Sequence, residues 1–190
     1  MVISSDALLV RATLEGDLHA FEQLVERHRD VVFRVVARFV RDDEAEDVTQ
    51  DTFLRAFHRL DRFRGDAPFR SWLLRIAHNT AVTSVTRSGR VATHPLEAIG
   101  EDLAGSVHRG GPAEHLEQRE RRARLDTKLK GLSLGHRTVL VLRDIEGLPY
   151  SEIARITDAP LGSVKARVHR AREEFIELLR TNTYDWELPR

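Results

Sequence analysis

The 190-residue sequence contains no cysteine, which excludes disulfides, thiolate zinc sites and redox sensing by this chain. It has no apolar run long enough to span a bilayer. The N-terminus carries Asp6 and lacks the basic segment that begins a secretion signal. We therefore expect a cytoplasmic protein with no membrane insertion.

Signatures of catalysis and of metal or phosphate binding are also missing. No two histidines are spaced four residues apart, so no helical His-x-x-x-His metal pair exists. No glycine-rich loop ends in Lys-Ser or Lys-Thr, as a phosphate-binding loop would. We expect no catalytic residues, no metal, no cofactor and no enzymatic activity.

Charged residues make up 32% of the sequence, and the formal net charge is zero. Acidic and basic residues nevertheless cluster in separate segments. An acidic block without a basic residue contains Asp42, Asp43, Glu44, Glu46, Asp47 and Asp51. A basic stretch follows, with only Asp61 and Asp66 as acids, and contains Arg55, Arg59, Arg62, Arg64, Arg70, Arg75, Arg87 and Arg90. Surfaces of opposite charge indicate different partners.

Hydrophobic periodicity predicts helices throughout the N-terminal half, at 18–40 with Asp17 as N-cap, 44–60 and 69–86. Glycine and proline then punctuate an apolar-poor segment, and helical periodicity returns near residue 114. The predicted fold is all-α, with two small helical domains (1–90 and 114–184), a flexible linker (91–113) and a short tail (185–190).

Residues 150–172 predict a helix-turn-helix. A first helix at 151–157 ends at Asp158-Ala159-Pro160, and a second begins near Leu161 or Gly162. An apolar stripe along the second helix contains Val164, Val168, Ala171, Phe175 and Leu178. The opposite side is basic and acid-free up to Arg172, which favours DNA recognition over a merely solvated face.

Three segments carry a family resemblance: EDVTQDTFLRAF (46–57), FRSWLLRIAHN (69–79) and LPYSEIARITDAPLGSVKARVHRARE (148–173). Together they resemble the extracytoplasmic-function sigma factors of bacterial RNA polymerase. The resemblance implies an alternative sigma factor that binds the β′ clamp helices and β flap of core polymerase. It also implies recognition of the −10 and −35 elements of promoter DNA, and an anti-sigma factor as a further partner.

The resemblance also implies three sets of site residues. The polymerase-binding set lies on a helix with Val48, Phe53 and Leu54 turned inward, and it contains Glu46, Asp47, Gln50 and Asp51. The −10 set, expected to be exposed, contains Arg62, Arg64, Arg75, His78 and Asn79. The −35 set contains Ser163, Lys165, Arg167, His169 and Arg170.

Several positions depart from the family pattern. Thr83 replaces an acid and Thr86 an arginine, which makes the −10 specificity less predictable, and Ala166 removes a hydroxyl from the DNA-facing side. Trp72 shares a face with other apolar residues, which favours the core over base stacking.

The sequence leaves two other classes of DNA-binding protein as alternatives. A response-regulator type of transcription factor would need a receiver domain with strands, and a DNA-cleaving enzyme would show metal-dependent cleavage.

Overall fold

The computed structural model describes residues 5–87 and 124–180, and these residues form helices without a strand. The predicted linker (91–113) and tail (185–190) lie outside this part of the chain. The all-α prediction is confirmed. In the described ranges no helix is both long enough and apolar enough to cross a membrane.

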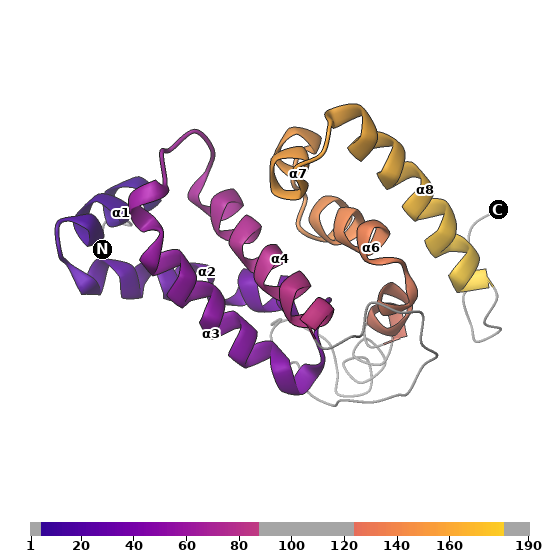
Figure 1. The fold of residues 1–190 in the computed structure, drawn as a ribbon, viewed down its shortest axis with the longest axis horizontal. Helices are drawn as coiled ribbons and strands as arrows, with labels where there is room; N and C mark the ends of the chain where they lie inside the picture. The colour runs from indigo at the N-terminus through magenta and orange to yellow at the C-terminus, as the bar shows by residue number, and fades with distance from the viewer. Residues whose placement is uncertain (1–4, 88–123, 181–190) are drawn as a thin grey trace, which may run out of the picture.

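The N-terminal half packs its helices around a common core (Figure 1). Its elements are α1 (Asp6–Leu14), α2 (Leu18–Ala37), α3 (Asp42–His58), the short 3-10 helix η1 (Leu60–Arg62) and α4 (Phe69–Arg87). The prediction of Asp17 as N-cap is confirmed, since its carboxylate accepts hydrogen bonds from the backbone nitrogens of His19 (3.0 Å) and Ala20 (3.3 Å). The helix α1 lies outside the predicted helices, the first of which begins at residue 18.

Trp72 belongs to an aromatic cluster at the start of α4. Its ring centroid lies 5.5 Å from those of Phe63 and Phe69, and the rings are tilted against one another. Trp72 also packs against the hydrophobic core, which confirms the preferred interpretation. The cluster fixes the turn between η1 and α4, because Phe63 lies before this turn and Phe69 after it.

The C-terminal half begins with a helical stretch at 124–131. It continues with α6 (Leu134–Leu140), the π-helical turn η2 (Val141–Ile145), α7 (Tyr150–Thr157) and α8 (Leu161–Arg180). The predicted break at Asp158-Ala159-Pro160 is confirmed, since α7 ends at Thr157 and α8 begins directly after Pro160. Asp158 caps α7 in a left-handed conformation (φ 50°). The predicted apolar stripe of α8 faces the core: Val164, Val168 and Ala171 are buried, and Phe175 and Leu178 are half-buried and pack against the same cluster.

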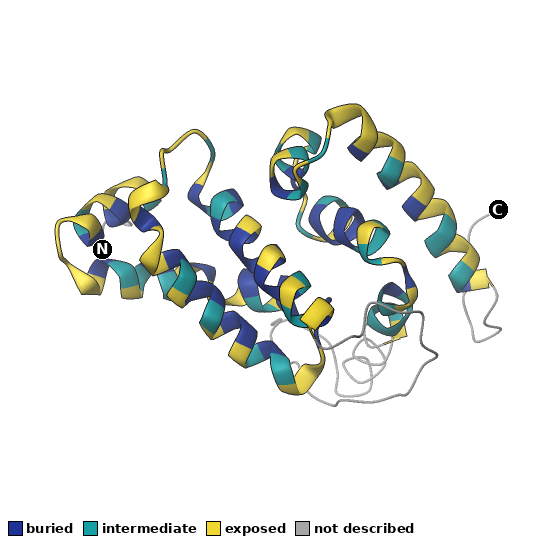
Figure 2. Ribbon diagram, in the orientation of Figure 1, coloured by how far each residue is buried: buried dark blue, intermediate teal, exposed yellow. Residues whose placement is uncertain are grey.

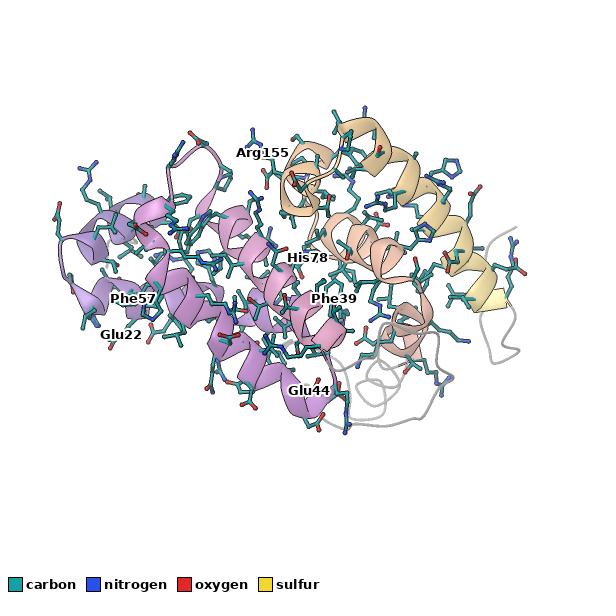
Figure 3. The ribbon with its side chains drawn as sticks, viewed as in Figure 1. Glu22, Phe39, Glu44, Phe57, His78 and Arg155 are labelled. Atoms are coloured by element: carbon teal, nitrogen blue, oxygen red, sulfur yellow. The ribbon has the colours of Figure 1, made fainter. Side chains whose placement is uncertain are left out.

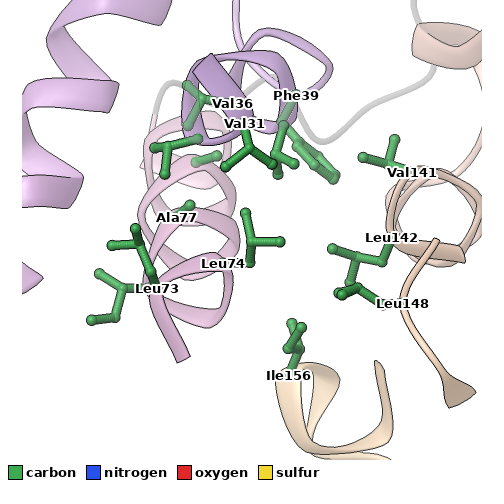
Figure 4. Packing of buried hydrophobic residues seen from close by; sticks show 14 of the residues in the cluster. Val31, Val36, Phe39, Leu73, Leu74, Ala77, Val141, Leu142, Leu148 and Ile156 are labelled. Atoms are coloured by element: carbon green, nitrogen blue, oxygen red, sulfur yellow. The ribbon is translucent and has the colours of Figure 1, made fainter. Parts of the chain in front are cut away.

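The two halves pack against each other through α4, which packs on α7 and meets α6 through the contact of His78 with Thr138 (Figure 1). Their buried side chains form one continuous hydrophobic cluster. At its centre Leu74 and Phe39 face Val141, Leu142 and Ile156 (Figure 4). We call this contact the interdomain joint; the prediction of two domains on a tether did not anticipate it.

Candidate functional site

The acidic face of α3 is exposed, but two of its four predicted residues are engaged within the protein. Glu46 accepts a hydrogen bond from Arg29 (2.8 Å), and this contact raises the pKa of the arginine. Asp51 pairs with Arg55 one turn later (2.9 Å). Asp47 and Gln50 are exposed and offer charge and hydrogen-bonding groups to solvent.

The expectation that Leu54 turns inward is wrong, because its side chain is 57% exposed. Phe53, the preceding residue, is buried, and one helical step of about 100° carries Leu54 away from the core. Phe57 is partly exposed beside it and contacts the ring of Phe21 edge-on at 4.9 Å. The outer surface of α3 therefore combines carboxylates with apolar side chains.

The predicted −10 residues fall into two groups. Arg62 and Arg64 are exposed around the turn before α4, where Gly65 adopts a positive φ of 76° that favours glycine. Arg75 and Asn79 are exposed one helical turn apart on α4. These four side chains lie on surfaces open to a ligand.

The expected exposure of His78 is wrong. The residue is only 8% exposed and lies in the interdomain joint (Figure 3). Its Nε2 atom is 3.0 Å from Thr138 Oγ1, and its ring meets that of Phe39 edge-on at 5.6 Å. Burial lowers the pKa of His78, because the joint disfavours the charged imidazolium.

Polar contacts between residues far apart in the sequence line the joint. The Arg70 Nη2 atom donates to the buried carboxylate of Glu146 at 2.6 Å, and Arg34 lies 3.6 Å from the same carboxylate. The Ser71 hydroxyl donates to Glu152. No sequence signal could identify these pairs, because the partners are more than seventy residues apart.

The basic side of α8 points away from the N-terminal half (Figures 1 and 2). Ser163, Lys165, His169 and Arg170 are exposed, as expected. Arg167 is half-buried, with its Cδ atom near the space beside Gly135. Arg172, at the edge of this face, pairs with Asp144 at 2.5 Å, which raises the pKa of the arginine. Lys165, His169 and Arg170, together with Ser163, form an exposed basic surface on α8.

No group of His, Asp or Glu in the described ranges has the arrangement of a metal site. A groove of about 450 Å³ lies between α3 and α4. Its lining mixes both charges with hydroxyls: Asp47, Val48, Asp51, Arg55, Thr80, Thr83, Ser84 and Arg87. This lining does not indicate a particular cofactor.

Comparison with known proteins matches both halves of the chain. Residues 24–91 match the sigma-70 region 2 family, and residues 114–175 match the sigma-70 region 4 family. The ECF RNA polymerase sigma-E factor of Escherichia coli K12 is 36% identical over 174 residues, covering 89% of this chain and 91% of that protein. The RNA polymerase sigma-H factor of Pseudomonas aeruginosa is 35% identical over 182 residues, covering 92% of this chain and 93% of that protein.

A solved structure agrees with these matches. CnrH, in complex with the cytosolic domain of CnrY, superposes with a TM-score of 0.69 at 30% identity, covering 95% of this chain and 100% of that chain. Sequence and fold thus agree over nearly the full length of the protein. The chain belongs to the extracytoplasmic-function family of RNA polymerase sigma factors, and it is an alternative sigma factor that directs promoter-specific transcription initiation.

Proposed function

We propose that the two halves divide the work of promoter recognition. The unit at 1–90 binds core polymerase and the −10 element, and the unit at 114–184 binds the −35 element, with 91–113 as linker and 185–190 as tail. The observation that carries this proposal is the separation of charge. The same face of α3 exposes Asp47 and, about two turns later, apolar Leu54, whereas α8 exposes only basic and neutral side chains from Leu161 to Arg170. A carboxylate-bearing face repels DNA and suits a basic protein surface.

Core polymerase would dock on the outer surface of α3. Asp47 and Gln50 are free to pair with a partner, and Leu54 adds an apolar contact that loses water on binding. Glu46 and Asp51 would also contact the polymerase, either by leaving their internal partners Arg29 and Arg55 or by sharing them with the polymerase. The β′ clamp helices and the β flap are the proposed contact points on the polymerase.

The −10 element would bind around η1, the following turn and the exposed stripe of α4. Arg62 and Arg64 would hold phosphates, while Arg75 and Asn79 present donors along one side of the helix. His78 is left out of this set, because it is buried in the joint.

The −35 element would bind the exposed side of α8 in the major groove. Lys165, Arg170 and His169 extend from this side, with Ser163 near the helix start and Arg167 at the edge. The buried stripe beneath them holds the helix against α6 and α7, so the cations are presented on a rigid element.

Reconstitution with core polymerase tests the proposal. The purified chain should form a complex with core polymerase and start transcription at discrete genomic positions, which start-site mapping would identify by their shared −10 and −35 sequences. Failure to bind core polymerase, or start sites identical to those of core polymerase alone, would contradict it. As a specificity subunit, the chain should not cleave DNA when Mg²⁺ is added.

A regulatory partner fits the same proposal. CnrH was solved with the cytosolic domain of CnrY, so we propose that this chain also binds an anti-sigma factor, and that it acts in the cytoplasm, where RNA polymerase works. Affinity purification of the chain from its own cells should recover both core polymerase and such a partner.

A further inference from the structure

The interdomain joint covers one side of α4 and leaves the neighbouring side open. Ser71 and His78 are buried against the C-terminal half, whereas Arg75 and Asn79 are exposed. All four lie on one helix of 3.6 residues per turn, so the covered and open stripes are adjacent. DNA that lies along α4 would therefore meet the C-terminal half at the edge of its binding surface.

Glu146 is the most tightly enclosed charge in this contact. Its side chain is 3% exposed, and its carboxylate lies between Arg70 (2.6 Å) and Arg34 (3.6 Å). The Arg70 guanidinium also donates to the Glu146 backbone carbonyl, at 3.3 and 3.4 Å. Glu146 of the C-terminal half thus forms ion pairs with two arginines of the N-terminal half.

Carboxylate and phosphate are the two anions that a guanidinium pairs with most readily, and they compete for the same donors. We propose that the joint is an autoinhibitory contact, in which the Glu146 carboxylate takes the place of a DNA phosphate on Arg34 and Arg70. The covered side of α4 becomes available to DNA only after the halves separate. This inference rests on the proposed function, since it takes α4 as part of the −10 surface.

The composition of the joint is suited to opening. Around its apolar centre lie ion pairs that water can replace, including Arg38–Asp126 (2.5 Å) and Lys130–Asp42 (3.2 Å). Interfaces between domains of one chain that are rich in polar contacts separate more readily than apolar ones. The basic side of α8, in contrast, is already exposed, so the closed form restricts the −10 surface selectively.

The absence of cysteine allows a direct test of opening. Spin labels on Glu26→Cys in α2 and Ser151→Cys in α7 would report the distance between the halves in the full chain, because both positions are exposed and no native thiol competes. Glu146→Gln removes the charge while preserving the size of the side chain. Asp144→Asn is the matched control, because its partner Arg172 lies in the same half.

We expect Glu146→Gln to shift the label distances toward longer values and Asp144→Asn to leave them unchanged. Glu146→Gln should also bind a short fluorescein-labelled single-stranded DNA of mixed sequence more tightly than the parent protein. If the open form is about a tenth of the parent population, the gain in affinity reaches about tenfold. Unchanged distances, or opening without tighter binding, would overturn the proposal.

Circular dichroism would show whether Glu146→Gln remains folded. If it does not, Glu152→Gln, which weakens the contact to Ser71 across the same joint, decides the question by the same two readouts. With core polymerase, parent and Glu146→Gln should start transcription from the same positions. A parent protein that fails to start transcription refutes the proposed function, whatever the label distances show.

Discussion

The Nε2 atom of His78 on α4 lies 3.0 Å from the Oγ1 atom of Thr138 on α6, joining two helices from opposite halves of the chain. The Thr138 hydroxyl donates to the carbonyl of Leu134 at 2.9 Å. Its oxygen therefore accepts from the imidazole N–H, which assigns the proton of the neutral ring to Nε2, while the other ring nitrogen, Nδ1, lies 3.3 Å from the side-chain oxygen of Asn79. This pair places a titratable group at the centre of the closed structure.

The stability of the protein should fall as pH drops below the ordinary histidine pKa of about 6.5. Burial lowers the pKa of His78 in the folded state, so the unfolded chain takes up a proton first, and the loss continues until the folded-state pKa is reached. Urea unfolding at a series of pH values would show this slope, and His78→Gln should reduce it.

His19 provides a comparison of opposite sign. Its contact with Glu22 (2.9 Å) raises the pKa of this exposed histidine, so any stability it adds is present at low pH and lost as pH rises. His19→Gln should therefore not reduce the acid-side loss. An equal pH slope in the parent and in His78→Gln would contradict the assignment to His78.

Leu142→Ala should destabilise the protein by about 2–5 kcal/mol, because the side chain is fully buried and its removal leaves a cavity at the joint. Leu8→Ala, at a position 56% exposed, should change the free energy of unfolding by less than about 0.5 kcal/mol. Urea denaturation of both variants measures the difference. Equal small effects would show that the halves do not pack together in solution.

Lys165→Ala and Arg170→Ala should weaken binding to −35 DNA while leaving core polymerase binding intact. A lost base contact costs about 1–3 kcal/mol, and a lost phosphate contact lowers the salt dependence of binding by about one unit of slope. Holoenzyme binding to promoter DNA at several salt concentrations separates the two cases. Arg11→Ala, an exposed cation on α1, is the control and should bind normally.

Asp47→Lys should weaken the complex with core polymerase by about tenfold or more, because like charges across an interface cost several kcal/mol. Glu15→Lys makes the same charge change at another exposed position and should have little effect. Competition for core polymerase against a labelled parent chain measures both. If the two variants compete equally well with the parent, α3 is not the docking surface.

Local patterns in the sequence predicted local features well. The carboxylate of Asp17 caps α2, and Val164, Val168 and Ala171 form the buried stripe of α8, because capping and helical periodicity depend on residues within a few positions of one another. Leu54 shows the limit of this approach. Its apolar character indicated burial, yet its place on the helix turns it to solvent.

The sequence by itself determined the helices that follow α1, the basic face of α8, the acidic face of α3 and the family that combines them. Only the tertiary structure decided that α4 packs against the C-terminal half, burying His78 and enclosing Glu146 between Arg34 and Arg70. The reason is physical: a polar residue on a helix is equally compatible with solvent and with a distant hydrogen-bonding partner. Which one it meets depends on contacts between segments far apart in the chain.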